Sequence, residues 1–284
     1  MRILYIDCDS LRPDHLGAYG YDRATSPNID EIAADARRFT NYYVSDAPCL
    51  PSRTAYFTGR FGINTGVINH SGINADIRHR GASRGTSTAG RFSSLPRALR
   101  DAGHETVFVS PFPQRHGAWH VVDGFDQWID TGGGGGERAE VVYPHAEEWL
   151  AANAGEEDWY LHVNFWDPHT HYDTPMEFGN PFADEDPPAW HTEEILREHY
   201  ESYGPHSAHD LHHPYLTGGD VPDLERTPDE IATLEDYDRW IDGYDVGIRY
   251  MDEFIGDMMD LLRAEGVYEE TMIVVSADHG ENQG

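Results

Sequence analysis

The stretch ILYIDCDS, residues 3–10, sets the expected fold of this chain. It opens with an apolar run that is typical of a buried strand, and the acidic residues Asp7 and Asp9 follow at once. Near the other end of the sequence, a strand-like run at 272–275 is followed by Ser276-Ala277-Asp278-His279. Ligands of open α/β sheets lie outside the carboxyl ends of strands, and hard oxygen donors with one imidazole suit Ca²⁺, Mg²⁺ or Mn²⁺. A lone acidic residue at a strand end is more often a cap or turn residue, but two such clusters favour a ligand site.

Between these clusters, strand-like and helix-like segments alternate. Runs rich in β-branched and aromatic residues predict strands at 106–110 and 159–165, and a capping box at Thr227–Glu230 predicts the start of a long helix that ends at Gly266. The alternation predicts a single α/β domain over residues 1–284, with a mostly parallel sheet flanked by helices. The segment 167–226, rich in Pro, His, Asp and Tyr, is expected to be an irregular insertion that forms one wall of a cleft.

The composition is strongly acidic. The chain has 51 Asp and Glu residues against 20 basic residues, all of them Arg, which gives a formal net charge of −31. This balance argues against nucleic acid or an anionic membrane as a partner, because both require basic patches. It suits a protein that stays soluble in concentrated salt, although an ordinary acidic protein is the alternative.

The sequence also predicts a location. No stretch approaches the ~18 apolar residues of a membrane span, and no signal peptide precedes the first strand. We therefore expect a cytoplasmic protein whose cysteines, Cys8 and Cys49, form no disulfide.

The stretch CLPSRTAYFTGR, residues 49–60, places Cys49 at an expected helix start beside a proline, a serine and an arginine. A lone cysteine is by default a small buried hydrophobic residue, but that role does not explain these neighbours. Cys49-Leu50-Pro51-Ser52-Arg53, completed by Thr58-Gly59-Arg60, resembles the signature of the type I sulfatases, which belong to the alkaline phosphatase superfamily. The acidic, lysine-free composition gives the resemblance a haloarchaeal-like character.

Three further segments carry the same resemblance. Residues 3–20 are similar to the family's opening metal-binding strand and loop. The segment Trp166-Asp167-Pro168-His169 is similar to the one that carries a substrate-contacting histidine, and Ser276–Glu281 is similar to the second metal cluster. The resemblance implies an alkaline-phosphatase-like, mostly parallel α/β fold. It also implies hydrolysis of a small-molecule or carbohydrate sulfate ester.

In that family the signature cysteine is oxidised to formylglycine, so the resemblance implies that a formylglycine-generating enzyme converts Cys49. One hydroxyl of the hydrated aldehyde can attack sulfur, and the other can then collapse to the aldehyde and expel sulfate without a second hydrolytic water. Arg53 would hold the diol and balance charge through its planar guanidinium group.

The resemblance also implies a metal centre. A divalent cation, Ca²⁺ before Mg²⁺ or Mn²⁺, would be held by Asp9, Asp278 and His279 together with the modified Cys49, and would polarise the nucleophile and the sulfate oxygens. His169 would contact the substrate anion or the leaving oxygen.

The sequence departs from the family pattern at two positions near these residues. Ser10 stands where many sulfatases have a second acid after Asp9, and Asp7 supplies the extra acid. Because alternate residues of a strand share a face, Asp7 lies on the same face as Asp9 and is expected either to bind the metal or to lie behind the ligands. The family's lysine-histidine pair has no lysine here, and Arg115 and His116 are the candidate replacements.

Two features leave other functions open. The pair Asp278-His279 resembles the phosphonate monoester and phosphodiester hydrolases of the same superfamily, so a phosphorus ester is an alternative substrate. The sequence stops directly after this cluster, where sulfatases continue into further strands and a C-terminal subdomain. We therefore expect a truncated family member, and an inactive metal-binding fragment is the third possibility.

Overall fold

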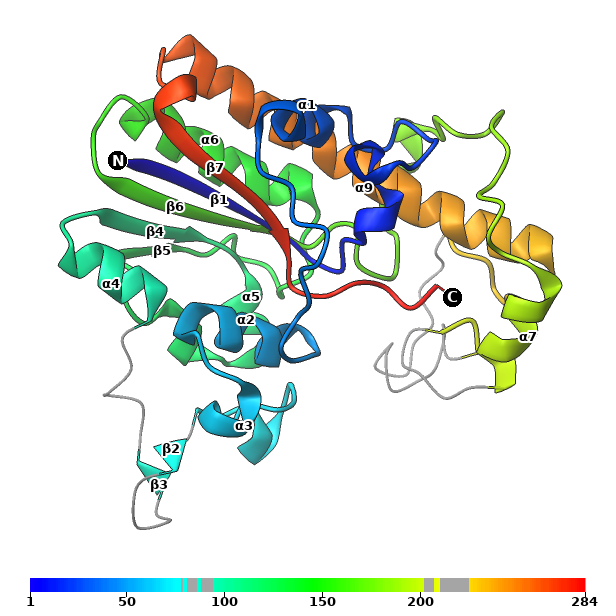
Figure 1. The fold of residues 1–284 in the computed structure, drawn as a ribbon, viewed down its shortest axis with the longest axis horizontal. Helices are drawn as coiled ribbons and strands as arrows, with labels where there is room; N and C mark the ends of the chain where they lie inside the picture. Colours follow the sequence, from blue (N-terminus) through cyan, green and yellow to red (C-terminus); the bar gives the residue numbers. More distant parts are fainter. Residues whose placement is uncertain (78, 81–85, 88–93, 202–206, 210–224, 284) are drawn as a thin grey trace. The chain divides into compact units, whose positions relative to one another are not determined.

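The computed structural model describes residues 1–77, 79–80, 86–87, 94–201, 207–209 and 225–283 (Figure 1). The chain divides into two compact units. The first unit comprises residues 1–9, 35–166 and 254–279, and the second comprises residues 10–34, 167–253 and 280–284. The segment 167–226, expected as an insertion, belongs to the second unit as far as it is described.

A five-stranded sheet forms the centre of the first unit, in the order β5-β4-β6-β1-β7. All its pairings are parallel. This confirms the predicted α/β class. The strands are β1 (Arg2–Cys8), β4 (Glu105–Val109), β5 (Gln127–Ile129), β6 (Trp159–Phe165) and β7 (Thr271–Ala277). Separately, β2 (His79–Arg80) and β3 (Thr86–Ser87) form an antiparallel pair.

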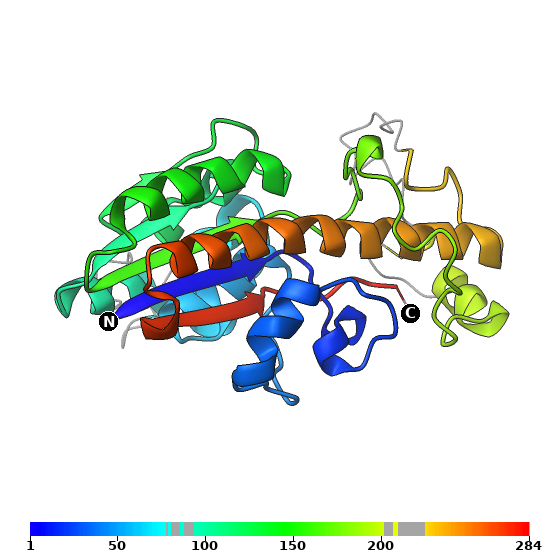
Figure 2. The same cartoon turned by 90° about the horizontal axis from the view of Figure 1, so that it is seen from above.

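The described part of the first unit also contains the helices α2 (Cys49–Thr58), α3 (Gly62–Thr65), α4 (Leu95–Asp101), α5 (Phe112–His116) and α6 (Ala139–Asn153). Of these, α4 and α6 pack against strands of the sheet, and α3 packs against α2 and β2. The helix α6 packs along β6 and β4, as Figure 2 shows. On α2, Leu50 and Phe57 pack with Phe108 of β4 and with Phe125 in an apolar core of the first unit. Because one side of α2 is fixed in this core, its other side chains are held in place for the polar cluster described below.

The register of the sheet brings three strand ends level. Asp7 of β1 pairs with Ser276 of β7 on one side and with Asn164 of β6 on the other. The residues that follow β1 and β7 therefore leave the sheet side by side, and this places Asp9 and Asp278 at the same edge.

The second unit is organised around the first part of a long helix, α9 (Leu234–Ala264). Its Asp245 accepts hydrogen bonds from the Tyr21 hydroxyl at 2.6 Å and from Arg23 at 2.9 Å, and lies 2.6 Å from His15 Nδ1. These contacts fix the segment 10–25. The described part of this unit also contains the α-helices α1 (Pro27–Asp35) and α7 (Glu193–Glu201).

The predicted start of α9 is wrong. The helix begins at Leu234 and not at the Thr227–Glu230 box. Thr233 and Asp236 form the real cap: the Thr233 hydroxyl oxygen accepts from Asp236 N–H at 3.2 Å, and Asp236 Oδ2 accepts from Thr233 N–H at 2.9 Å. Among the described residues, no helix combines the length and the apolar character needed to cross a membrane.

Candidate active site and metal centre

The helix α2 presents Cys49 and Arg53 one turn apart on the same face. It ends at Gly59, whose φ of 64° is a left-handed conformation that favours glycine, which explains the Gly of the Thr-Gly-Arg element. The Ser52 hydroxyl donates to the carbonyl oxygen of Asp278 at 2.5 Å. Ser52 therefore ties α2 to the segment that leaves β7.

Four potential metal ligands gather beside the start of α2. Ligand atoms of Asp9, Cys49, Asp278 and His279 all lie within 4.8 Å of one another. Cys49 Sγ is 3.1 Å from His279 Nε2 and 3.7 Å from Asp9 Oδ1. The structure thus brings together, within the first unit, residues that are far apart in sequence and that were each predicted as ligands.

Arg53 lies at the centre of the acidic residues and is fully buried. Its Nη1 donates to Asp278 Oδ2 at 2.6 Å and to Asp9 Oδ2 at 3.0 Å, and its Nε donates to Asp7 Oδ2 at 2.7 Å. Burial opposes the charge of Arg53, but these carboxylates outweigh it and raise its pKa well above the usual value. The guanidinium group is therefore a permanent buried cation.

Asp7 lies behind Arg53 and outside the group of four potential ligands. Besides Arg53, its Oδ2 accepts from the Tyr56 hydroxyl at 3.1 Å and from Asn164 Nδ2 at 3.2 Å. Burial opposes ionisation of Asp7, yet Arg53 and His162 together lower its pKa. Of the two roles predicted for Asp7, the structure therefore favours the one behind the ligands, where it fixes Arg53.

The environment of Cys49 disfavours a thiolate. The side chain is 1% exposed, and burial, followed by the charges of Asp9 and Asp278, raises its pKa well above the ordinary value despite the nearby Arg53. Burial also raises the pKa of Asp278 to about 6; Arg53 opposes this increase and Asp9 adds to it. An unmodified Cys49 is thus a protonated and weak nucleophile at neutral pH.

Arg115 and His116 end the short helix α5, which follows β4. The guanidinium carbon of Arg115 lies 3.8 Å from the ring centroid of Trp166, and Nη1 donates to the Gly135 carbonyl at 3.4 Å. Burial lowers the pKa of Arg115, while the charges of Asp9 and Cys49 act in the opposite direction, so Arg115 lies within electrostatic reach of the ligand cluster.

His70 is a neighbour of the cluster that the sequence did not reveal. Its ring centroid is 4.4 Å from that of His116, and Nε2 of each ring is buried without a hydrogen-bond partner in the described part of the chain. Burial, with the nearby Arg115, lowers the pKa of His70 to about 4; burial, with His70 and Arg115, lowers that of His116 to about 3. Both rings are neutral at pH 7 and have an unused nitrogen.

The family model described as Sulfatase matches residues 2–284. The chain belongs to the sulfatase family. It is similar to arylsulfatase A of Bos taurus, with 45% identity over 65 residues, or 23% of this chain and 13% of the bovine protein.

Two solved structures share the fold. The structure of BT4656 in complex with its substrate, D-glucosamine-2-N,6-O-disulfate, has a TM-score of 0.68 at 19% identity, over 98% of this chain and 65% of that one. The phosphonate monoester hydrolase of Agrobacterium radiobacter has a TM-score of 0.66 at 20% identity, over 100% of this chain and 63% of that one. These likenesses confirm the predicted fold. This sulfatase-family chain covers less than two thirds of each of these proteins.

His169 of this sulfatase-family protein belongs to the second unit and is 7% exposed. Its Nδ1 lies 2.5 Å from the carbonyl oxygen of Thr170. Because a carbonyl oxygen can only accept, Nδ1 carries the hydrogen of this bond.

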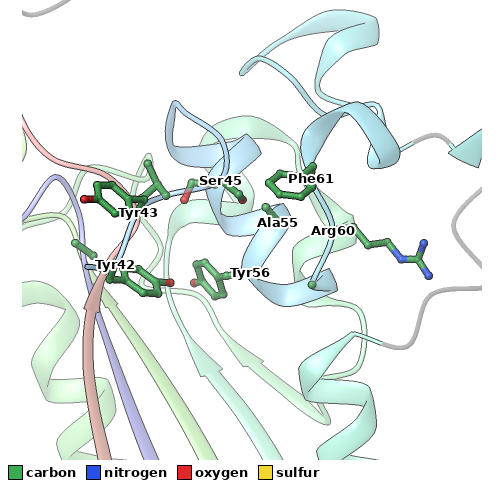
Figure 3. A pocket seen from close by; sticks show the side chains of 11 residues that line it. Tyr42, Tyr43, Ser45, Ala55, Tyr56, Arg60 and Phe61 are labelled. Atoms are coloured by element: carbon green, nitrogen blue, oxygen red, sulfur yellow. The ribbon is translucent and has the colours of Figure 1, made fainter. Parts of the chain in front are cut away.

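The first unit also contains a cavity of about 220 Å³ beside α2 (Figure 3). Tyr42, Tyr43, Tyr56, Arg60 and Phe61 are among its lining residues. None of the four potential metal ligands lines it, so this cavity lies next to the candidate site and is not the site itself.

The donor set fits a divalent cation. The buried carboxylates of Asp9 and Asp278 share one nitrogen of Arg53, and the raised pKa of Asp278 reflects burial together with repulsion from Asp9. A further positive charge between them would relieve this repulsion. Two carboxylates and one imidazole, that of His279, are suitable ligands, and Cys49 Sγ marks the place of the formylglycine oxygens.

Proposed function

We propose that this protein hydrolyses sulfate esters with a formylglycine nucleophile made from Cys49. The supporting observation is that Cys49, at the start of α2, lies buried among Asp9, Asp278 and His279, with Arg53 one turn further along. This environment keeps a thiol protonated, which makes the unmodified side chain a poor nucleophile. The hydrated aldehyde has two hydroxyl groups at the same position and avoids this difficulty.

The reaction then needs two steps at the modified Cys49, a displacement at sulfur and an elimination of sulfate. One hydroxyl oxygen of the hydrate bonds to sulfur while the bond from sulfur to the ester oxygen breaks, and the alcohol leaves with a proton. The second hydroxyl loses its proton, the carbonyl re-forms, and sulfate departs with the bonding pair of its carbon-oxygen bond. Water then rehydrates the aldehyde.

Each charged residue has a role in this scheme. A divalent cation, Ca²⁺ in our proposal, would be held by Asp9, Asp278 and His279 and supplies Lewis-acid polarisation of the oxygens. Arg53 keeps the carboxylates in place and orients the hydrate. Arg115 contributes positive charge toward the sulfate group of the substrate.

In the tautomer with hydrogen on Nε2, the neutral rings of His70 and His116 would supply uncharged donors for the sulfate oxygens, since Nε2 of each has no hydrogen-bond partner among the described residues. When protonated on both nitrogens, His169 would deliver a proton from Nε2 to the leaving oxygen or contact the substrate anion.

We propose a small-molecule or carbohydrate sulfate ester as the substrate. The BT4656 structure, whose substrate is a glucosamine disulfate, supports this class through its related fold. A formylglycine-generating enzyme is the proposed partner. Cys49 is 1% exposed in the folded chain, so this partner has to act before α2 packs into place.

A phosphonate monoester or phosphodiester is the second candidate substrate. The Asp278-His279 pair and the fold shared with the Agrobacterium radiobacter phosphonate monoester hydrolase support it. Turnover of matched aryl sulfate and aryl phosphodiester compounds separates the candidates, and an inert phosphorus compound eliminates the second one.

We further propose that the protein works in the cytoplasm at high salt concentration. The excess of 51 acidic over 20 basic residues supports the salt requirement, because screening removes the self-repulsion of the surface. Two free cysteines are consistent with a reducing compartment.

The first test is mass spectrometry of the Cys49 peptide from protein made in its own host. An aldehyde in place of the thiol, together with sulfate release that Cys49→Ala abolishes, supports the proposal. An unmodified thiol, in a host that converts other such cysteines, overturns it. Cation binding without turnover at any salt concentration would instead indicate an inactive metal-binding fragment.

A further inference from the structure

Glu281 contacts the residue that follows His169 in the second unit. Its Oε2 accepts hydrogen bonds from the Thr170 backbone N–H at 3.3 Å and from the Thr170 hydroxyl at 3.1 Å. Thr170 is only 2% exposed, so these donors have little access to water. Glu281 also follows His279, a proposed ligand, by two positions in sequence.

The carbonyl oxygen of the same Thr170 accepts the hydrogen of His169 Nδ1 at 2.5 Å. This bond sets both the tautomer and the direction of the ring, because a neutral ring that carries its hydrogen on Nδ1 carries none on Nε2. The Thr170 backbone thus has Glu281 on its N–H and His169 on its carbonyl. A shift of Thr170 would move the acceptor that fixes His169.

The backbone around Glu281 is itself held in the second unit. Arg12 Nη1 donates to the carbonyl oxygen of Glu281 at 3.3 Å. Gln283, which is fully buried, donates from Nε2 to the Tyr172 hydroxyl at 2.8 Å, and its carbonyl accepts from the Tyr237 hydroxyl. The Glu281 carboxylate is therefore anchored from both sides along the chain.

We propose that Glu281 is a positioning residue that holds the Thr170 turn so that His169 presents Nε2 in a defined tautomer. This inference rests on the proposed sulfatase activity. It assigns to the segment 278–283 two roles, one through the ligands Asp278 and His279 and the other through Glu281.

The test uses Glu281→Ala, Glu281→Gln and His169→Ala, with Glu148→Ala as a control at an exposed position of α6. Glu281→Ala should lower kcat/KM by about 10- to 100-fold, the range typical for residues that orient a functional histidine. Glu281→Gln should stay within about threefold of the wild type, because an amide oxygen still accepts from both Thr170 donors. Glu148→Ala should leave turnover unchanged.

The kinetic pattern separates positioning from a general loss of structure. Glu281→Ala should change the same parameter, kcat or KM, as His169→Ala, with the same dependence on the leaving group across a series of aryl sulfates. The double variant should be no slower than His169→Ala alone. The inference would be overturned if the losses of the two single variants added in the double variant. It would also be overturned if Glu281→Ala slowed all aryl sulfates equally while the effect of His169→Ala depended on the leaving group.

A second measurement does not depend on turnover. Long-range ¹H–¹⁵N NMR, with His169 assigned by comparison with His169→Ala, should show the Nδ1–H tautomer in the wild type and in Glu281→Gln. Glu281→Ala should show a mixture of tautomers. If the wild type carries formylglycine but has no sulfatase activity, the proposed function fails, and the tautomer measurement still decides the role of Glu281. An unchanged tautomer in Glu281→Ala overturns that role.

Discussion

Replacement of Arg53 by alanine should be among the most destabilising single changes in the first unit. The side chain is fully buried and makes ion pairs with Asp7 at 2.7 Å, Asp9 at 3.0 Å and Asp278 at 2.6 Å. Arg53→Ala removes the one guanidinium group shared by these carboxylates and leaves three buried acids without it. The expected loss comes from these stranded charges more than from the lost attraction.

Breaking a buried ion pair by removing one partner typically costs about 3–5 kcal/mol. Since three carboxylates are affected, we expect at least the upper half of this range, about 4–5 kcal/mol of the free energy of unfolding at pH 7.5. For a chain of 284 residues, that corresponds to a fall in Tm of about 7–8 °C. Salt should change this loss little, because buried pairs are weakly screened.

Thermal and urea unfolding followed by tryptophan fluorescence, in one high-salt buffer with EDTA, would measure the loss. Arg197→Ala is the matched control, because Arg197 is 61% exposed and lies 3.9 Å from Glu194, a surface pair worth about 0–1 kcal/mol. The deficit of Arg53→Ala should shrink as the pH falls from 8 to 5. The pKa of Asp278 is already raised to about 6, and without Arg53 the carboxylates protonate more readily.

A loss below about 1 kcal/mol for Arg53→Ala would refute this reasoning, since it would place the pair in the range of exposed ion pairs. A deficit that grows on acidification would do the same. The first result would mean that the carboxylates find other partners, and the second that their charge is not the source of the loss.

Three further outcomes follow from the structure. Burial lowers the pKa of His162 and lowers that of His116 to about 3, so both rings are neutral in the fold; the unfolded chain takes up protons below about pH 6.5. Stability should therefore fall on acidification by up to about 1.4 kcal/mol per pH unit for each histidine, and urea titrations of His162→Asn should show a shallower fall. Asp252→Ala should cost about 1–3 kcal/mol, measured by the urea midpoint, because Asp252 accepts the N–H groups of Asn28 and Ile29 in the first turn of α1; a change below about 0.5 kcal/mol would contradict this. An aryl phosphate monoester should react at least about 100-fold more slowly in kcat/KM than the matched aryl sulfate at pH 8, with a smaller difference near pH 5.

The sequence alone was sufficient to predict the strands β1 and β7, but it did not predict where the helix α9 starts. The apolar runs at 3–6 and 272–275 fall in β1 and β7. A strand inside a parallel sheet carries few polar residues, as β1 shows, and β7 keeps an apolar run although it is a half-buried edge strand. The start of α9 was misplaced because two capping boxes lie close together, at Thr227–Glu230 and at Thr233–Asp236. Local pattern cannot choose between them, and the tertiary contacts of the helix decide.

The residues of the candidate site also differ in whether the sequence alone could reveal them. The signature around Cys49 and the acids at the strand ends were visible as local patterns. His70 carried no such signal, because its relation to His116 comes from packing between a loop and the helix α5, which are distant in sequence. The position of Asp7 behind Arg53 follows from the register of β1 beside β6, where Asn164 meets the same carboxylate. Pairing partners of this kind cannot be read from a single strand.

The charges of the site predict that a singly charged ester would be the better substrate. Asp7, Asp9 and Asp278 contribute three negative charges, Arg53 and Arg115 contribute two positive charges, and the neighbouring histidines are neutral at pH 7. With one divalent cation the site carries a single net positive charge, which a sulfate ester neutralises. A phosphate monoester carries nearly two negative charges at pH 8 and would leave one buried charge uncompensated, at a cost of about 3–5 kcal/mol. Near pH 5 the same phosphate is singly charged, so the discrimination should fade there, and a phosphodiester, singly charged at both pH values, should escape it.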